Sequence, residues 1–199
     1  MLSGLFGKYQ MKMIHNVLSA LCKDLNTFLK ARFGLQEDLV VLSELMDLDG
    51  SVAMTMENRM ICTLLNLEQE RTNLNAPVLN NRTVTNPPFN LNLYVIFSAF
   101  FAASNYLEAL KALSFTLAFF QGKQVFTPAN TPGIDPKIDK VVIEMVNVEL
   151  KDLSNLWTAL GAKHLPCVLF KIRMISITSD TILEETTPIR QLDHTPARV

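Results

Sequence analysis

Charged side chains are scarce in this sequence. They make up 19% of its 199 residues, against about 25% in a typical soluble domain, whereas hydrophobic residues make up 49%. A chain of this length can bury its own core as a single domain. The formal net charge of -1 provides no general attraction to nucleic acid, so no nucleic-acid partner is expected. The low charge indicates that part of the surface is hidden in an assembly.

Residues that carry chemistry are also few. Cys22, Cys62 and Cys167 do not stand at metal-ligand or redox spacing, and we interpret them as buried free thiols of a reducing compartment. The three histidines are far apart in the sequence, and no glycine-rich phosphate loop or HExxH motif occurs. We therefore predict no catalytic, cofactor or metal site, and no enzyme. Because catalytic groups can meet in space, a small-molecule-binding or enzymatic α/β domain is kept as the alternative function.

No stretch of the sequence is long enough for a membrane helix. The longest largely apolar run covers 94–103, whereas a spanning helix needs roughly 20 apolar residues. The first twelve residues have too short an apolar region for a secretory signal. We expect no direct membrane insertion, and synthesis in the cytoplasm without export by the general route.

The most apolar part of the chain predicts a strand followed by a helix. From Phe89 to Phe100 hydrophobic residues recur every second position, which is typical of a strand with one buried face. Asn105 stands three residues before Glu108, a spacing that predicts a capping box, and Gly122 ends the helix. This helix is apolar over most of its circumference. It therefore needs a second cover, from a neighbouring element or a neighbouring subunit.

Periodicity elsewhere predicts further helices and strands. Helices are expected at Met13–Phe33 and Glu149–Leu160, each followed by a glycine. Strands are expected at 59–71, 140–148 and 167–178, and the fold class is mixed α/β (α+β), with a largely antiparallel sheet and about three packed helices. In the last strand Lys171 and Arg173 face away from the core, where Glu144 or Glu149 can pair with them. The carboxylates of Glu68 and Glu70 are interpreted as a solvated strand end.

Turn residues predict the connections. Asp49 and Gly50 indicate a hairpin turn between apolar flanks. A long loop is expected at Thr72–Pro88, and an extended connection at Gln124–Pro136. The segment Ser179–Val199 has no sustained period, yet it keeps apolar residues. We interpret it as an arm that orders against a partner, with a disordered terminus left open; its candidate interface residues are Ile182, Leu183, Ile189, Arg190 and Leu192.

Several separated segments carry a family resemblance. The runs NPPFNLNLYVIFSAFF, NYLEALKALSFTLAFFQG and VVIEMVNVELKDLSNLWTALGAKHLPCVLFKIRMISI occur in this order. Together they resemble the N-terminal domain of the cap, or tube-terminator, protein of phage-tail-like contractile injection systems, over about 14–177. The residues that carry the match are Pro87, Pro88, Tyr94, Asn105, Tyr106, Glu108, Leu156, Trp157, Leu160 and Gly161.

The resemblance implies a structural role. Such proteins form a ring, expected to be a hexamer, that closes the distal end of the inner tube and contacts the last layer of the sheath. The implied partners are copies of this chain, the inner tube protein and the sheath protein, with no cofactor and no catalytic centre. The implied organisation is an N-terminal arm at 1–12, a cap domain at 13–178 and a C-terminal arm at 179–199. A bacterial cytoplasmic origin and a place in an assembled particle follow from the same resemblance.

Overall fold

A computed structural model describes residues 13–46, 57–70, 83–85, 89–177 and 182–185. Its helices are α1 (Met13–Phe33), α2 (Tyr106–Gly122) and α3 (Leu150–Ala159), with a 3₁₀ turn at Ala103–Asn105 before α2. The strands of the main sheet lie in the order β1-β2-β4-β7-β6-β5. Their bounds are β1 Val40–Leu42, β2 Arg59–Gln69, β4 Phe89–Phe100, β5 Val125–Phe126, β6 Val141–Val146 and β7 Cys167–Ile177. A separate pair joins β3 (Thr83–Thr85) to β8 (Ile182–Glu185).

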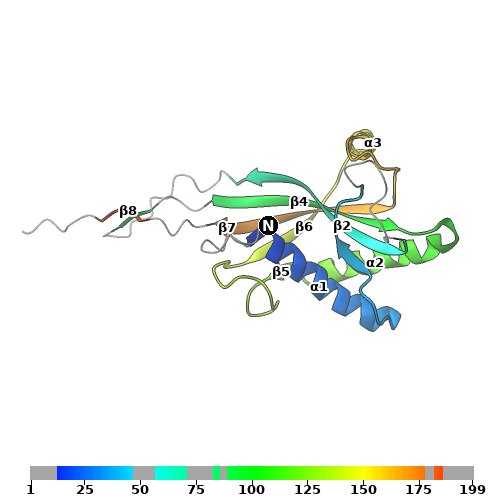
Figure 1. The fold of residues 1–199 in the computed structure, drawn as a ribbon, viewed down its shortest axis with the longest axis horizontal. Coiled ribbons are helices and arrows are strands. Elements are labelled where there is room, and N and C mark those ends of the chain that lie inside the picture. Colours follow the sequence, from blue (N-terminus) through cyan, green and yellow to red (C-terminus); the bar gives the residue numbers. More distant parts are fainter. Residues whose placement is uncertain (1–12, 47–56, 71–82, 86–88, 178–181, 186–199) are drawn as a thin grey trace, which may run out of the picture.

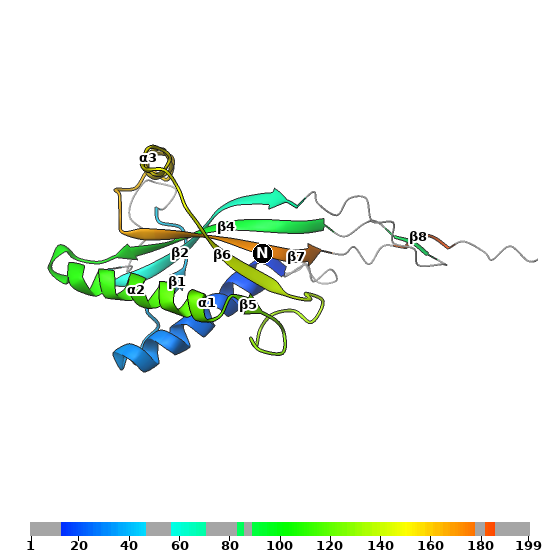
Figure 2. The same cartoon turned by 180° about the vertical axis from the view of Figure 1, so that it is seen from behind.

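The sheet has helices on both faces. Helices α1 and α2 cover one face, and α3 lies across the other (Figure 1). Seen from behind, α2 and β6 are on the near side of the molecule, and α1 lies beyond α2 (Figure 2). The mixed α+β class and the largely antiparallel sheet are confirmed, since among the described strands only β1 pairs in parallel with its neighbour.

Strand β4 holds the centre of this arrangement. It pairs antiparallel with β2 on one side and with β7 on the other. Side chains of successive residues point to opposite faces of a sheet, so Val95 and Phe97 pack under α1 and α2 while Ile96 packs under α3. The two faces of β4 thus supply two hydrophobic cores, as its apolar alternation predicts.

Helix α2 begins and ends where the sequence predicts, but the predicted capping box is wrong. The side chain of Asn105 makes no hydrogen bond to the first turn. Its Nδ2 donates instead to Oδ1 of Asn58 at 2.9 Å, and Glu108 pairs with Lys111 at 2.8 Å. The 3₁₀ turn before α2 brings Asn105 within reach of Asn58, and that tertiary contact replaces the local cap.

Glycines end the other two helices. Gly34 follows α1 with a φ of 65°, and Gly161 follows α3 with a φ of 67°. Residues with a Cβ rarely adopt this left-handed conformation, so the predicted stops have a direct physical cause. The observed helix at Leu150–Ala159 is slightly shorter than the predicted one.

The hairpin turn expected at Asp49 and Gly50 lies outside the described residues. Three other expectations about connections need correction. Part of the predicted loop at 72–88 is strand β3, and part of the predicted irregular arm is its partner β8. The connection after α2 contains the short strand β5, whose Phe126 is fully buried.

Asn26 of α1 closes the outer edge of β1. Its Nδ2 donates to the carbonyl of Val40 at 2.8 Å, and its Oδ1 accepts from the Val40 N–H at 2.7 Å. The side chain is only 4% exposed. A buried side-chain amide thus provides the hydrogen bonds that a further strand would otherwise make with Val40.

Replacing Asn26 by alanine should lower the free energy of unfolding by about 2–4 kcal/mol, because it leaves two buried backbone groups without partners. Urea denaturation followed by circular dichroism measures this change. Thr27→Ala on the exposed side of the same helix is the control, with an expected change within about 0.5 kcal/mol. Equal effects of both substitutions would show that the edge contact does not stabilise the fold.

Candidate assembly surfaces

A stripe of exposed apolar side chains runs along α2. Leu107 is 71% exposed, Leu110 40% and Leu117 39%, and Tyr106 at the start of the helix is also exposed. The opposite face of the helix buries Ala109, Ala112, Thr116, Phe119 and Phe120. We call Tyr106, Leu107, Leu110 and Leu117 the α2 stripe. Within the part of the chain that the structure describes, the second cover expected for this helix is missing along the stripe.

An apolar hollow lies beside the other flank of α2. It has a volume of about 260 Å³ and is lined by Phe33, Leu35, Leu39, Asn58, Phe101, Asn105, Glu108 and Ala112. We call it the α1–α2 hollow. Asn58, at a left-handed φ of 60°, holds one wall in place, because its Oδ1 accepts from the Ala102 N–H at 3.3 Å as well as from Asn105.

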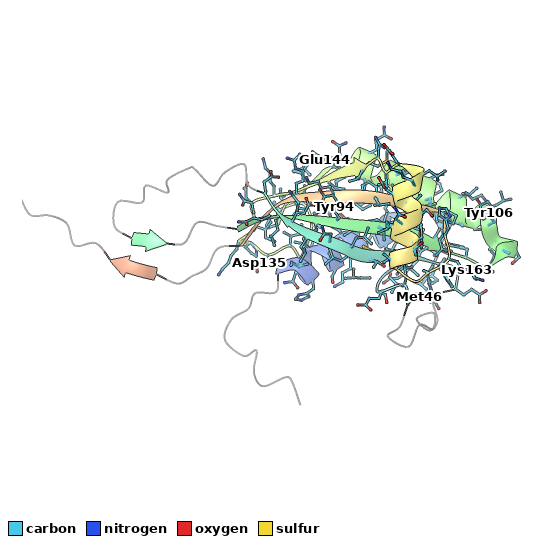
Figure 3. All side chains as sticks on the ribbon, turned by 90° about the horizontal axis from the view of Figure 1, so that it is seen from above. Met46, Tyr94, Tyr106, Asp135, Glu144 and Lys163 are labelled. Carbon is cyan, nitrogen blue, oxygen red and sulfur yellow. The ribbon has the colours of Figure 1, made fainter. Side chains whose placement is uncertain are left out.

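The half of the sheet that α3 leaves uncovered carries polar side chains. Figure 3 looks onto this face and shows Tyr94 and Glu144 beside α3. The hydroxyl of Tyr94 donates to Glu68 at 2.9 Å, and the Nζ of Lys171 lies 5.5 Å from the centre of the Tyr94 ring. This family-motif tyrosine is therefore a link between the two neighbouring strands.

On the same face, Arg173 joins β7 to β6 and to the residue that follows β2. Its guanidinium contacts Glu144 at 3.2 Å and Glu70 at 3.6 Å. Glu144 beside it raises the pKa of Arg173 above its ordinary value. The expected pairing with Glu144 is thus confirmed, whereas Glu149 pairs with Lys151. The interpretation of Glu70 as part of a solvated strand end needs correction. Its side chain is only 16% exposed and accepts a hydrogen bond from the amide of Asn92.

Trp157 attaches α3 to the sheet. Its side chain is 3% exposed and packs with Ile61 and Ile96. Leu156 and Leu160, two further family-motif residues, pack against the same small core. The centre of the His164 ring lies 5.6 Å from the centre of the indole. Trp157 is thus a core anchor, as its helical spacing suggests.

The three cysteines are free thiols, as predicted. Cys22 and Cys62 are buried, and the structure brings them together from α1 and β2. The hydrogen bond with Cys22, followed by burial, raises the pKa of the Cys62 thiol well above its ordinary value. Burial also raises the pKa of Cys167, and the neighbouring Trp157 indole offsets part of that rise.

These shifts predict slow thiol chemistry in the native state. At pH 8 iodoacetamide should modify Cys167 slowly and Cys62 only after unfolding, because the thiolate is the reactive form. Cys22 should also react only after unfolding, because its side chain is buried. An unfolded thiol ionises near pH 8.5 while folded Cys62 keeps its proton, so stability should fall as the pH rises above about 8.5. Mass spectrometry of alkylated protein, with and without urea, measures the reactivity. Rapid modification of all three thiols in the native chain would contradict the packing of Cys22 against Cys62.

The candidate arm can be placed only in part. Ile182 and Leu183 belong to β8, which pairs with β3 outside the main sheet. Ile189, Arg190 and Leu192 lie outside the described residues, as do Pro87 and Pro88 of the family motif. The role of the arm therefore stays a prediction.

The described residues contain no group of three or more His, Cys, Asp or Glu side chains arranged to hold a metal ion. None of the helices they form has the length and hydropathy that a membrane crossing requires.

Comparison with known proteins reveals a family and a fold. The family model of the Pvc16 N-terminal domain matches residues 17–191. The fold is similar to the sheath/tube terminator of an extracellular contractile injection system, PVC, in its extended state, with a TM-score of 0.63 and 16% identity over 94% of this chain. It is also similar to the anti-feeding prophage cap, a tube terminating cap, with a TM-score of 0.58 and 16% identity over 90% of this chain.

This chain corresponds to only part of those two proteins. The matches cover 64% and 60% of their chains, respectively. No curated protein sequence matches this chain significantly.

Proposed function

This chain belongs to the Pvc16 N-terminal domain family, and we propose that it is a cap, or tube terminator, of a contractile injection system. In this role a ring of subunits, expected to be a hexamer, closes the distal end of the inner tube and contacts the terminal layer of the sheath. The observation that carries the proposal is the family match over residues 17–191. The similarity of fold to two tube terminators supports it.

The exposed surfaces of the chain suit a subunit of an assembly. A long stripe of uncovered leucines is unusual for a protein that acts alone, because monomeric proteins rarely expose large contiguous apolar patches. The α2 stripe exposes three leucines and a tyrosine along one side of a helix. A cap also needs faces of different character, one that fits the tube and one that does not template a further layer. The two sides of this chain do differ in character: the sheet around Tyr94 and Arg173 carries polar and charged side chains, whereas the α2 side exposes leucines.

The proposed role is structural, without a catalytic centre. We place the connections at 72–88 and 124–136 at the contacts with tube and sheath, and the segment 179–199 at a neighbouring subunit. Deletion of each segment in the assembled particle tests these assignments.

Electron microscopy of particles from cells with and without this gene tests the proposal. Deletion should give uncapped particles, particles of uneven length, or none, and restoring the gene should restore uniform capped particles. Particles of unchanged length with an intact cap in the deletion strain would rule out the terminator role. A catalytic defect is not expected in either strain.

A further inference from the structure

Helix α2 presents two different surfaces on opposite flanks. Successive helical residues are rotated by about 100°, so Leu110 points away from both Glu108 and Ala112. Leu110 belongs to the exposed α2 stripe, while Glu108 and Ala112 line the α1–α2 hollow. One flank thus carries projecting leucines, and the other borders a recess.

The recess has the size and lining to receive such a side chain. An apolar cavity of about 150 Å³ can hold benzene, and the α1–α2 hollow measures about 260 Å³. Phe33, Leu35, Leu39 and Phe101 provide its apolar wall. A leucine that enters it would exchange water contact for contact with these side chains, which is the main source of stability at apolar interfaces.

We propose that neighbouring copies of this chain pack head to tail, with the α2 stripe of one copy against the α1–α2 hollow of the next. One chain carries both partners of this contact, so each copy uses both surfaces. Packing of two stripes against each other would cover the leucines but leave the hollow open. A heterologous contact that repeats around an axis closes into a ring when the rotation fits. The ring is part of the proposed function, and in that respect the inference rests on it.

Two charge substitutions at exposed positions separate the surfaces. Leu107→Glu places a carboxylate in the stripe, and Leu35→Glu places one at the hollow, where Leu35 is 37% exposed. Asn155→Glu, on the exposed side of α3, adds the same charge elsewhere and is the matched control. Circular dichroism checks that each full-length variant folds. If L35E does not fold, Glu108→Trp blocks the hollow instead, from a side chain that is 49% exposed.

Sedimentation velocity then gives the test. We expect the wild type and N155E to assemble, and L107E and L35E each to sediment as monomers. An equimolar mixture of L107E and L35E should form a 1:1 dimer that grows no further, because one intact stripe and one intact hollow remain between them. This dimer is the result that distinguishes a head-to-tail contact from a symmetric one.

Several outcomes would overturn the inference. Assembly of L35E alone would show that the stripe pairs with another surface, or that a ligand or another segment of the same chain fills the hollow. Assembly of L107E alone, a mixture that stays monomeric, or a wild type that is monomeric at every concentration would each contradict it. The gene deletion tests the terminator role separately, because particle length is measured without reference to these surfaces.

Discussion

Replacing Phe120 by alanine is expected to lower the free energy of unfolding by about 3–5 kcal/mol. Phe120 is 3% exposed, and its ring lies 4.7 Å from that of Phe170, 5.4 Å from that of Phe97 and 6.2 Å from that of Phe126. One side chain of α2 thus contacts three strands. Its removal leaves a cavity where neighbouring rings cannot all move inward, so both burial and packing are lost.

Urea denaturation at a fixed protein concentration measures this effect, since assembly makes apparent stability depend on concentration. Gln121→Ala is the matched control, because Gln121 is the next residue of the same helix, is exposed and lies outside the α2 stripe. It should change the free energy of unfolding by less than about 1 kcal/mol. A comparable loss for both variants would mean that the aromatic cluster does not anchor α2.

Replacing Trp157 by alanine is the second large effect that we expect, again about 3–5 kcal/mol. The indole is the largest side chain of the small core under α3, where it packs with Ile61, Ile96 and Leu45. A helix of ten residues has little stability of its own in water, and α3 depends on this contact. We expect the variant to lose helix signal at a lower urea concentration than the wild type.

Two further substitutions test whether the loss of apolar contact at Trp157 causes this destabilisation. Trp157→Phe keeps most of the apolar contact and should cost less than the alanine substitution. Leu150→Ala, at a position that is 80% exposed on the same helix, should be neutral within about 0.5 kcal/mol. Because Trp157 is the only tryptophan, its fluorescence in the wild type reports directly on whether α3 has left the sheet. A W157A variant as stable as L150A would contradict the anchoring role.

The elements with the strongest periodicity were predictable from the sequence. The bounds of α1 and β4 agree with the predicted ones, because one face of each element is continuously apolar and a glycine or a turn follows. The inward and outward faces of β7 follow from the same rule for the residues up to Arg173. Local patterns of this kind need no knowledge of which elements become neighbours.

Contacts between distant residues were not predictable in this way. The cap that Asn26 provides for Val40 and the meeting of Cys22 with Cys62 both depend on how α1 lies on the sheet. The sequence does carry one hint, since Asn26 is a polar residue four positions after Cys22, within the buried face of α1. Glu70 was misjudged for a similar reason, because its partner Arg173 is contributed by β7.

Of the two candidate surfaces, one was predictable from the sequence and the other was not. The excess of apolar residues on α2 is visible in the sequence, and the structure confirms it as an exposed stripe. The α1–α2 hollow was not visible, because its lining comes from residues between Phe33 and Ala112 that only the fold brings together. Asn58 adopts a left-handed φ, which asparagine tolerates better than most residues, but the sequence alone does not mark it as part of a wall.

The two edges of the sheet are chemically unequal. At β1 the side chain of Asn26 occupies the outward backbone groups of Val40. At the other edge β5 pairs with Val141 and Val142 only, so among the described residues Met145 has no strand beyond it. A strand from another chain would find these backbone groups of Val40 already occupied, so β1 is a poor template for edge-to-edge pairing. Growth of a continuous sheet through both edges is thereby disfavoured.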